Sequence, residues 1–264
     1  MTFFSISLPH LLLLLAAGFA AGGVNAIAGG GTILTFPALL LTGSDSIRAN
    51  ATSTLALIVG IVGSVYGYRE HFAAIKGWLR QLLPVSLVGG LLGALLLTHT
   101  SSATFDRIVP FLLLFATVLF MFQGMISSRL PGGGRDVEAA KGPALAAIIL
   151  QFFTAIYGGY FGAGIGILML ATLSLSGLRN LNHMSAVKTA LGGLINVVAA
   201  VYFIGCGLID WPKMTVIALG AIPGYYLGSL FTQRIEARTV RRVICGIGLV
   251  IAGYFFVKKF GGAA

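Results

Sequence analysis

The chain has 264 residues, of which 57% are hydrophobic, 9% are charged and 37 are glycine. Seventeen basic and seven acidic residues are too few for the wet surface of a soluble domain of this size, where roughly 25% of residues are charged. The composition excludes a soluble enzyme, a disordered tail and a disulfide scaffold, and it predicts an all-α polytopic membrane protein. Because one crossing takes roughly 20 residues, the chain has room for about eight.

Ten apolar segments follow one another along the chain, and eight of them are long enough to cross a bilayer. The first is interpreted as a retained membrane helix rather than a secretory signal, because Met1 to Pro9 contains no Lys or Arg. The two short segments each follow a glycine cluster. In chain order, the segments are 5–28, 32–42, 50–68, 80–98, 108–126, 143–161, 164–176, 184–205, 213–232 and 243–257.

The net charge of +10 is interpreted as a topology signal, because the basic residues lie in short gaps between apolar runs. Nucleic acid is therefore not an expected partner, although a secondary attraction for anions fits the charge. Cys206 and Cys245 form no CxxC pair and have no paired histidines at ligand spacing, so neither a metal site nor another cofactor is expected.

The chain divides into two similar halves around a polar stretch rich in Pro, Gly and mixed charge. We expect a first transmembrane repeat over 1–128, a flexible linker over 129–142 and a second repeat over 143–264. The halves match at offsets of 133 to 135 residues. The matches are Gly29 and Gly31 with Gly162 and Gly164, Thr42-Gly43 with Ser176-Gly177, Trp78 with Trp211, Gly89 and Gly93 with Gly224 and Gly228, and Arg107 with Arg242.

The basic residues favour an inverted repeat over a parallel one. If each glycine cluster turns the chain back, so that the short segment is re-entrant, Lys and Arg divide 11 against 5 between the two sides, with Lys188 omitted. If the short segment instead completes a crossing, they divide 9 against 7. The first arrangement obeys the positive-inside rule better, gives each half an odd number of crossings and places both termini outside.

The glycine clusters predict breaks in membrane helices. Successive glycines free backbone groups that lipid cannot satisfy, so such a break survives where it lines protein or a wet cavity, and the exposed helix N-terminus there favours an anion. Close helix packing is the competing interpretation, and we favour it for the pairs spaced by four, such as Gly18 and Gly22. The candidate substrate-binding residues in the clusters are Asn25, Gly29, Gly30, Gly31, Thr32, Gly162 and Gly164.

A second polar run opens the long segment after each short one. Lys188 is the strongest single candidate, because a cation in an apolar span costs at least about 2.5–3.5 kcal/mol at the helix centre. Snorkelling to the interface is its alternative, and helix capping is the alternative for Asn50 and Asn182. The candidate substrate-binding residues here are Asn50, Thr52, Ser53, Ser185, Lys188 and Asn196.

No catalytic set lies within a span, so the sequence does not predict an enzyme. Four features recur in the same order in the second half, from Gly158 to Gly228. In the first half they are the glycine run from Gly22 to Pro37, the following Asn50-Ala-Thr-Ser-Thr, Trp78, and the stretch from Pro84 to Gly93. This pattern resembles the TauE/SafE family of sulfite exporters. The resemblance covers nearly the whole chain. It implies a multi-pass permease of the bacterial inner membrane that moves small sulfur-containing anions such as sulfite or organosulfonates.

We therefore expect a secondary transporter that works by alternating access around the two breaks. Its partners would be a small anionic substrate and the lipid bilayer, with homodimer formation left open. A permease for another anion, such as a carboxylate or thiosulfate, and a non-transporting membrane scaffold are the alternatives. Lys188 corresponds to Thr54 in the other half, and Asn50 to Met184, which argues against two equivalent ion sites.

Overall fold

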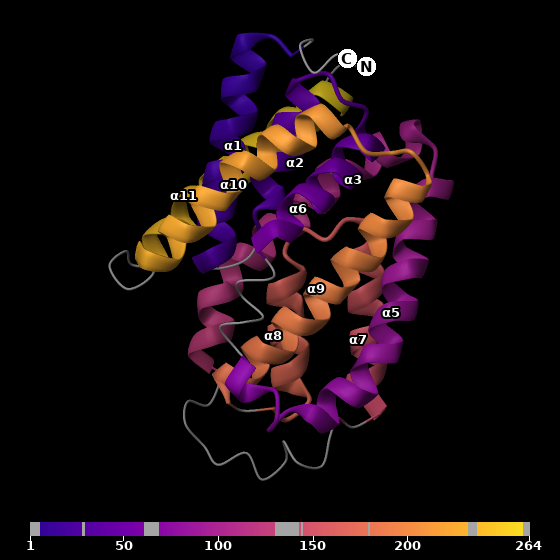
Figure 1. The fold of residues 1–264 in the computed structure, drawn as a ribbon, viewed down its shortest axis with the longest axis vertical. Coiled ribbons are helices and arrows are strands. Elements are labelled where there is room, and N and C mark those ends of the chain that lie inside the picture. The colour runs from indigo at the N-terminus through magenta and orange to yellow at the C-terminus, as the bar shows by residue number, and fades with distance from the viewer. Residues whose placement is uncertain are drawn as a thin grey trace.

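The computed structural model describes residues 6–27, 30–60, 69–129, 143, 145–178, 180–231 and 237–260. This part of the chain is helical throughout and contains no strand (Figure 1). The expected segments correspond to helices, although most of the linker over 129–142 and part of the segment 50–68 lie outside the described residues. In the first half the helices are α1 (Leu8–Ile27), α2 (Thr32–Leu41), α3 (Ser46–Leu57), α5 (Lys76–His99) and α6 (Ser102–Arg129), with short 3-10 turns at Ile58–Gly60 and Arg69–His71.

The second half repeats the same order of a helix, a short helix and three further helices. These are α7 (Leu145–Tyr160), α8 (Ile165–Leu175), α9 (Leu181–Gly205), α10 (Trp211–Phe231) and α11 (Ala237–Phe260). The turns that follow α2 and α8 contain Gly43 and Gly177 with φ of 81° and 95°, a left-handed conformation that favours glycine.

Six of the described helices begin earlier than the predicted apolar segments, namely α3, α5, α6, α9, α10 and α11. Side chains cap α3 and α9. The carboxylate of Asp45 accepts a hydrogen bond from the Ile47 N–H, so it caps α3. The Asn180 side chain accepts from the N–H groups of Asn182 and His183, so it caps α9. Capping therefore does not explain Asn50 or Asn182, because both lie inside their helices.

The helices at the centre of the fold pair across the two halves. α1 packs along α10 and α5 packs along α7, while α6 and α11 pack against each other. Since α1 corresponds to α7, α5 to α10 and α6 to α11, exchanging the halves turns the α1–α10 pair into the α5–α7 pair. The α6–α11 pair maps onto itself. α3 likewise packs on α10, and α9 on α5.

Glycines bring the paired helices into backbone contact. A methyl group on Gly18 or Gly22 would collide with the backbone of α10 at Ile217 or Ala221. On α5, a methyl group on Gly89 would lie 2.8 Å from the Phe152 carbonyl oxygen of α7, and one on Gly93 would collide with the same helix at Ile156. The packing interpretation of these glycines is confirmed, as is that of Gly224 and Gly228, which face α1.

The chain reverses direction at both glycine clusters. α2 lies beside α1 (Figure 1), and a methyl group on Gly31 would come within 2.7 Å of the Ala21 carbonyl oxygen. α8 lies beside α7, where Ile165 fills the space next to Gly158. Neither place is crossed by an uninterrupted helix.

Large apolar side chains are exposed on the surface, whereas several polar side chains are buried. Phe153, Val201 and Val250 are 64%, 63% and 73% exposed, whereas Asn50, Thr52 and Ser53 are buried. Four described helices are long and apolar enough to cross a membrane: Leu8–Ala26, Lys76–His99, Ser102–Leu119 and Asn182–Gly205. This distribution suits a membrane protein, because lipid solvates exposed apolar side chains. Lipid cannot hydrogen-bond polar groups, so those must find partners inside the protein.

Candidate functional site

The first break, between α1 and α2, is closed by a side chain of its own half. The amide oxygen of Asn25 accepts a hydrogen bond from the Gly31 N–H at 2.7 Å. The Asn25 amide donates to the Tyr225 hydroxyl at 2.7 Å, and that hydroxyl donates to the Leu57 carbonyl oxygen at 3.0 Å. Gly30, with φ of 106°, makes the turn, and Thr32 opens α2. Asn25 therefore occupies the place that an anion would take at the N-terminus of α2.

Removing the Tyr225 hydroxyl should destabilise the fold without weakening anion binding. In Tyr225→Phe the Asn25 amide and the Leu57 carbonyl each lose a partner, and we expect a loss of about 1–3 kcal/mol. Tyr202→Phe is the control, because the Tyr202 hydroxyl makes only a 3.4 Å contact with Thr98. Thermal unfolding of the purified variants measures both. A loss of anion affinity in Tyr225→Phe would show that the first break takes part in binding.

The second break, between α7 and α8, has no such internal acceptor. Gly162 and Gly164 hold φ of 75° and 76°, and no side chain caps α8 at Gly164. The Tyr157 hydroxyl holds the loop by donating to the Ala163 carbonyl oxygen at 2.6 Å. Within the described part of the chain, the N–H groups of Ala163, Gly164 and Gly166 find no acceptor. These donors lie where the positive end of the α8 dipole adds to their charge.

Lys188 and Asn196 of α9 lie next to this second break. A methyl group on Gly166 would lie 3.3 Å from Cδ of Lys188, and one on Gly162 would lie 3.7 Å from Oδ1 of Asn196. Gly192 lies halfway between them on the same face of α9, and a methyl group on it would lie 3.7 Å from the sulfur of Met169. Lys188 forms neither an ion pair nor a hydrogen bond with any residue that the structure describes. Among the described residues, a cation without a counter-ion thus lies beside N–H donors without acceptors, an arrangement that suits an anion.

Asn50 connects α3 to the second break. Its amide donates to the Tyr160 carbonyl oxygen, the last of α7, at 3.0 Å, and its Oδ1 is buried without a partner. Ser185 is buried one turn before Lys188 on α9. The second break thus brings together five of the predicted residues, namely Gly162, Gly164, Lys188, Asn196 and Asn50.

The remaining predicted residues lie elsewhere. The Ser53 hydroxyl forms a 2.6 Å hydrogen bond with that of Thr35 on α2, and the Thr52 hydroxyl accepts from the Asp210 N–H at 3.0 Å. Gly29 lies outside the described residues. Sequence reasoning missed Thr35, Tyr157 and Tyr225. The signal for the tyrosines was available, since Tyr157 adjoins the Gly158-Gly159 pair and Tyr225 follows Gly224.

The fold and this site define a polytopic membrane protein whose interior is polar around two helix breaks. Residues 14–255 match the family model described as "Sulfite exporter TauE/SafE". The chain belongs to this family of membrane transporters.

Its relatives carry matching names. The chain is 31% identical over 226 residues to a "Probable membrane transporter protein" of Haemophilus influenzae, covering 85% of this chain and 86% of the relative. It is 28% identical to "Probable membrane transporter protein ORF9" of a Sinorhizobium species, over 92% and 91% of the two chains. It is 25% identical to "Probable membrane transporter protein YfcA" of Escherichia coli K12, over 98% and 94%. No solved structure matches the chain.

Proposed function

We propose that this protein is a secondary transporter of small sulfur-containing anions, such as sulfite or organosulfonates, in the bacterial inner membrane. The observation that carries the proposal is the second break, where the N–H groups of 163, 164 and 166 lie beside Lys188 and neither they nor its ammonium have a hydrogen-bond or ion-pair partner among the described residues. Such donors at a broken helix are how secondary transporters hold anionic groups at mid-membrane. The family description supports sulfur oxyanions as the first substrates to test.

In this proposal the two halves, 1–128 and 143–264, are inverted repeats joined by the linker 129–142. The exchange of helix contacts between the halves supports a twofold relation. The hairpins at the two breaks support re-entrant short helices, the arrangement in which 11 basic residues lie on one side and 5 on the other. We place the side with 11 in the cytoplasm, following the positive-inside rule.

Alternating access follows from this arrangement. The contacts that join the halves run along glycine-bearing surfaces of α1, α5, α7 and α10. Two bodies related by a pseudo-twofold axis can rock against each other along such surfaces while the site between them stays fixed. In this mechanism Lys188 would neutralise the charge of the bound anion.

A panel of small anions added to the purified protein tests this function. Sulfite, an organosulfonate, thiosulfate, a carboxylate and chloride are each added at increasing concentration. A ligand present at 100 times its Kd stabilises the fold by about 2.7 kcal/mol, so the substrate is expected to raise Tm and chloride is not. Uptake of the stabilising anion into proteoliposomes then measures transport. A carboxylate as the best ligand would favour the alternative permease, and no response to any anion would favour the scaffold.

A further inference from the structure

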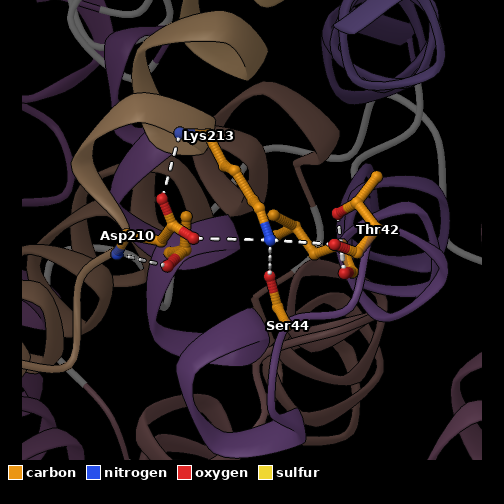
Figure 2. Close-up of polar contacts among 6 residues, drawn as sticks. Thr42, Ser44, Asp210 and Lys213 are labelled. Carbon is orange, nitrogen blue, oxygen red and sulfur yellow. Dashed lines mark hydrogen bonds and ion pairs between the residues drawn. The ribbon is translucent and has the colours of Figure 1, made fainter. Parts of the chain in front are cut away.

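Two turns that are far apart in the sequence meet at one end of the molecule, and a lysine joins them. Thr42 and Ser44 lie in the turn between α2 and α3, and Lys213 lies in the first turn of α10 (Figure 2). The Lys213 ammonium donates to the Thr42 carbonyl oxygen at 3.0 Å and to the Ser44 hydroxyl at 2.8 Å. It also pairs with Oδ2 of Asp210 at 3.5 Å. The ammonium has three donors, and two of them make hydrogen bonds across the halves.

Asp210 strengthens the same connection from its backbone and its side chain. Its N–H donates to the Thr52 hydroxyl of α3 at 3.0 Å, and its Oδ1 accepts from the Lys213 N–H at 3.2 Å. The side chains of Lys213 and Asp210 are only 16% and 26% exposed. Partial burial makes this ion pair stronger than an exposed one, because solvent screens it less. Three hydrogen bonds therefore join the first half to the second here.

At the opposite end of the molecule, most of the corresponding positions hold different residues. At the repeat offsets, Gly77 stands in place of Asp210, Arg80 in place of Lys213, Leu178 in place of Ser44 and Ala186 in place of Thr52. Arg80 is exposed. Leu178 and Ala186 are buried in an apolar cluster with Trp78, which is 1% exposed, whereas its counterpart Trp211 is 48% exposed. The polar contacts of Lys213 and Asp210 thus lie at one end, whereas Leu178 and Ala186 at the corresponding positions of the other end are packed in an apolar cluster.

We propose that Thr42, Ser44, Thr52, Asp210 and Lys213 form a latch that holds the outer end of the transporter closed and must open in each transport cycle. The proposal rests on the alternating access proposed above, which places Lys213 on the side with five basic residues. Hydrogen bonds are lost within a small displacement, whereas apolar side chains can slide over one another. The latch therefore makes outward opening an all-or-none step and biases the resting protein toward the closed outer end.

Thiol labelling from outside the cell tests the latch without any transport substrate. Ser53→Cys places a thiol next to Thr52, at a position that is 0% exposed, in a background where the exposed Cys206 is replaced by Ser. Lys213→Met is then expected to speed labelling by a membrane-impermeant maleimide about tenfold or more, since hydrogen bonds to a charged group contribute about 1.5–3 kcal/mol. Arg80→Met is the matched control and should leave the rate unchanged.

The buried Cys245 reports whether a variant is still folded. If Lys213→Met also makes Cys245 reactive, Asp210→Asn replaces it, because this variant weakens the ion pair and keeps the two bonds to the α2–α3 turn. Lys213→Arg should restore slow labelling. Equal labelling with and without Lys213 would overturn the latch. That result is separate from a failure of the proposed function, which would show as no anion binding or uptake by the wild-type protein.

Discussion

Replacing Lys188 by Gln is expected to abolish most anion binding and, at the same time, to stabilise the empty protein. The ammonium contributes a charge-assisted hydrogen bond to the anion, and its loss should lower affinity about 10- to 100-fold. Without an anion, Lys188 has no counter-ion among the described residues, and a charge in the span costs at least about 2.5–3.5 kcal/mol at the helix centre. A neutral side chain therefore removes a cost and should raise Tm.

The opposite signs of these two effects make the test specific. A residue that merely supports the fold would lower Tm when it is replaced. Lys76→Gln is the control, because Lys76 is exposed at the start of α5 and should change neither quantity. Anion titration followed by thermal unfolding measures both, and proteoliposome uptake measures transport. If Lys188→Gln binds and transports sulfite like the wild-type protein, the charge has no role in the site.

Gly164→Ala is expected to lose anion binding to a degree that its loss of stability does not explain. A left-handed conformation costs a residue with a side chain roughly 1–2 kcal/mol, and Gly164 has φ of 76°. Relaxing this strain would turn the N–H groups of 163 and 164 away from the direction that serves the anion. The added methyl group itself meets only ordinary contacts, at 3.6 Å or more, with Ala116.

Gly207→Ala provides the same backbone strain at a distance from the site. Gly207 has φ of 67° in the turn before α10, with nothing within 4 Å of an added methyl group. The two variants should lose similar amounts of stability, while only Gly164→Ala loses anion-dependent stabilisation. Equal anion responses would mean that the N-terminus of α8 does not hold the anion.

Most of the helices could be predicted from the sequence, because hydrophobicity in a membrane protein acts locally. The short apolar segments 32–42 and 164–176 correspond closely to α2 (Thr32–Leu41) and α8 (Ile165–Leu175). The packing of the glycines spaced by four could also be predicted, because two glycines one turn apart give a helix face without side chains, which another helix backbone can approach closely. The helix starts were less accurate, because Asp45 and Asn180 cap α3 and α9 before the apolar residues begin.

The pairing of polar groups could not be predicted in this way. The clearest case is Asn25, a predicted ligand of the substrate, whose side-chain amide bonds to Gly31 and to Tyr225, 200 residues away. Its counterpart at the repeat offset is Gly158, so the second break stays open. Which of two similar breaks is filled depends on the identity of one distant side chain, and hydrophobic patterns carry no information about it.

The pairing of α1 with α10 also affects the order in which the protein can assemble during synthesis. Asn25 and Tyr225 are 200 residues apart, so at about 5–20 residues per second the ribosome needs roughly 10–40 s to make the partner of the first helix. Until then α1 enters the membrane with Gly18 and Gly22 facing lipid. Since α5 and α7 are made close together, we expect that pair to form the nucleus on which the first and later helices assemble.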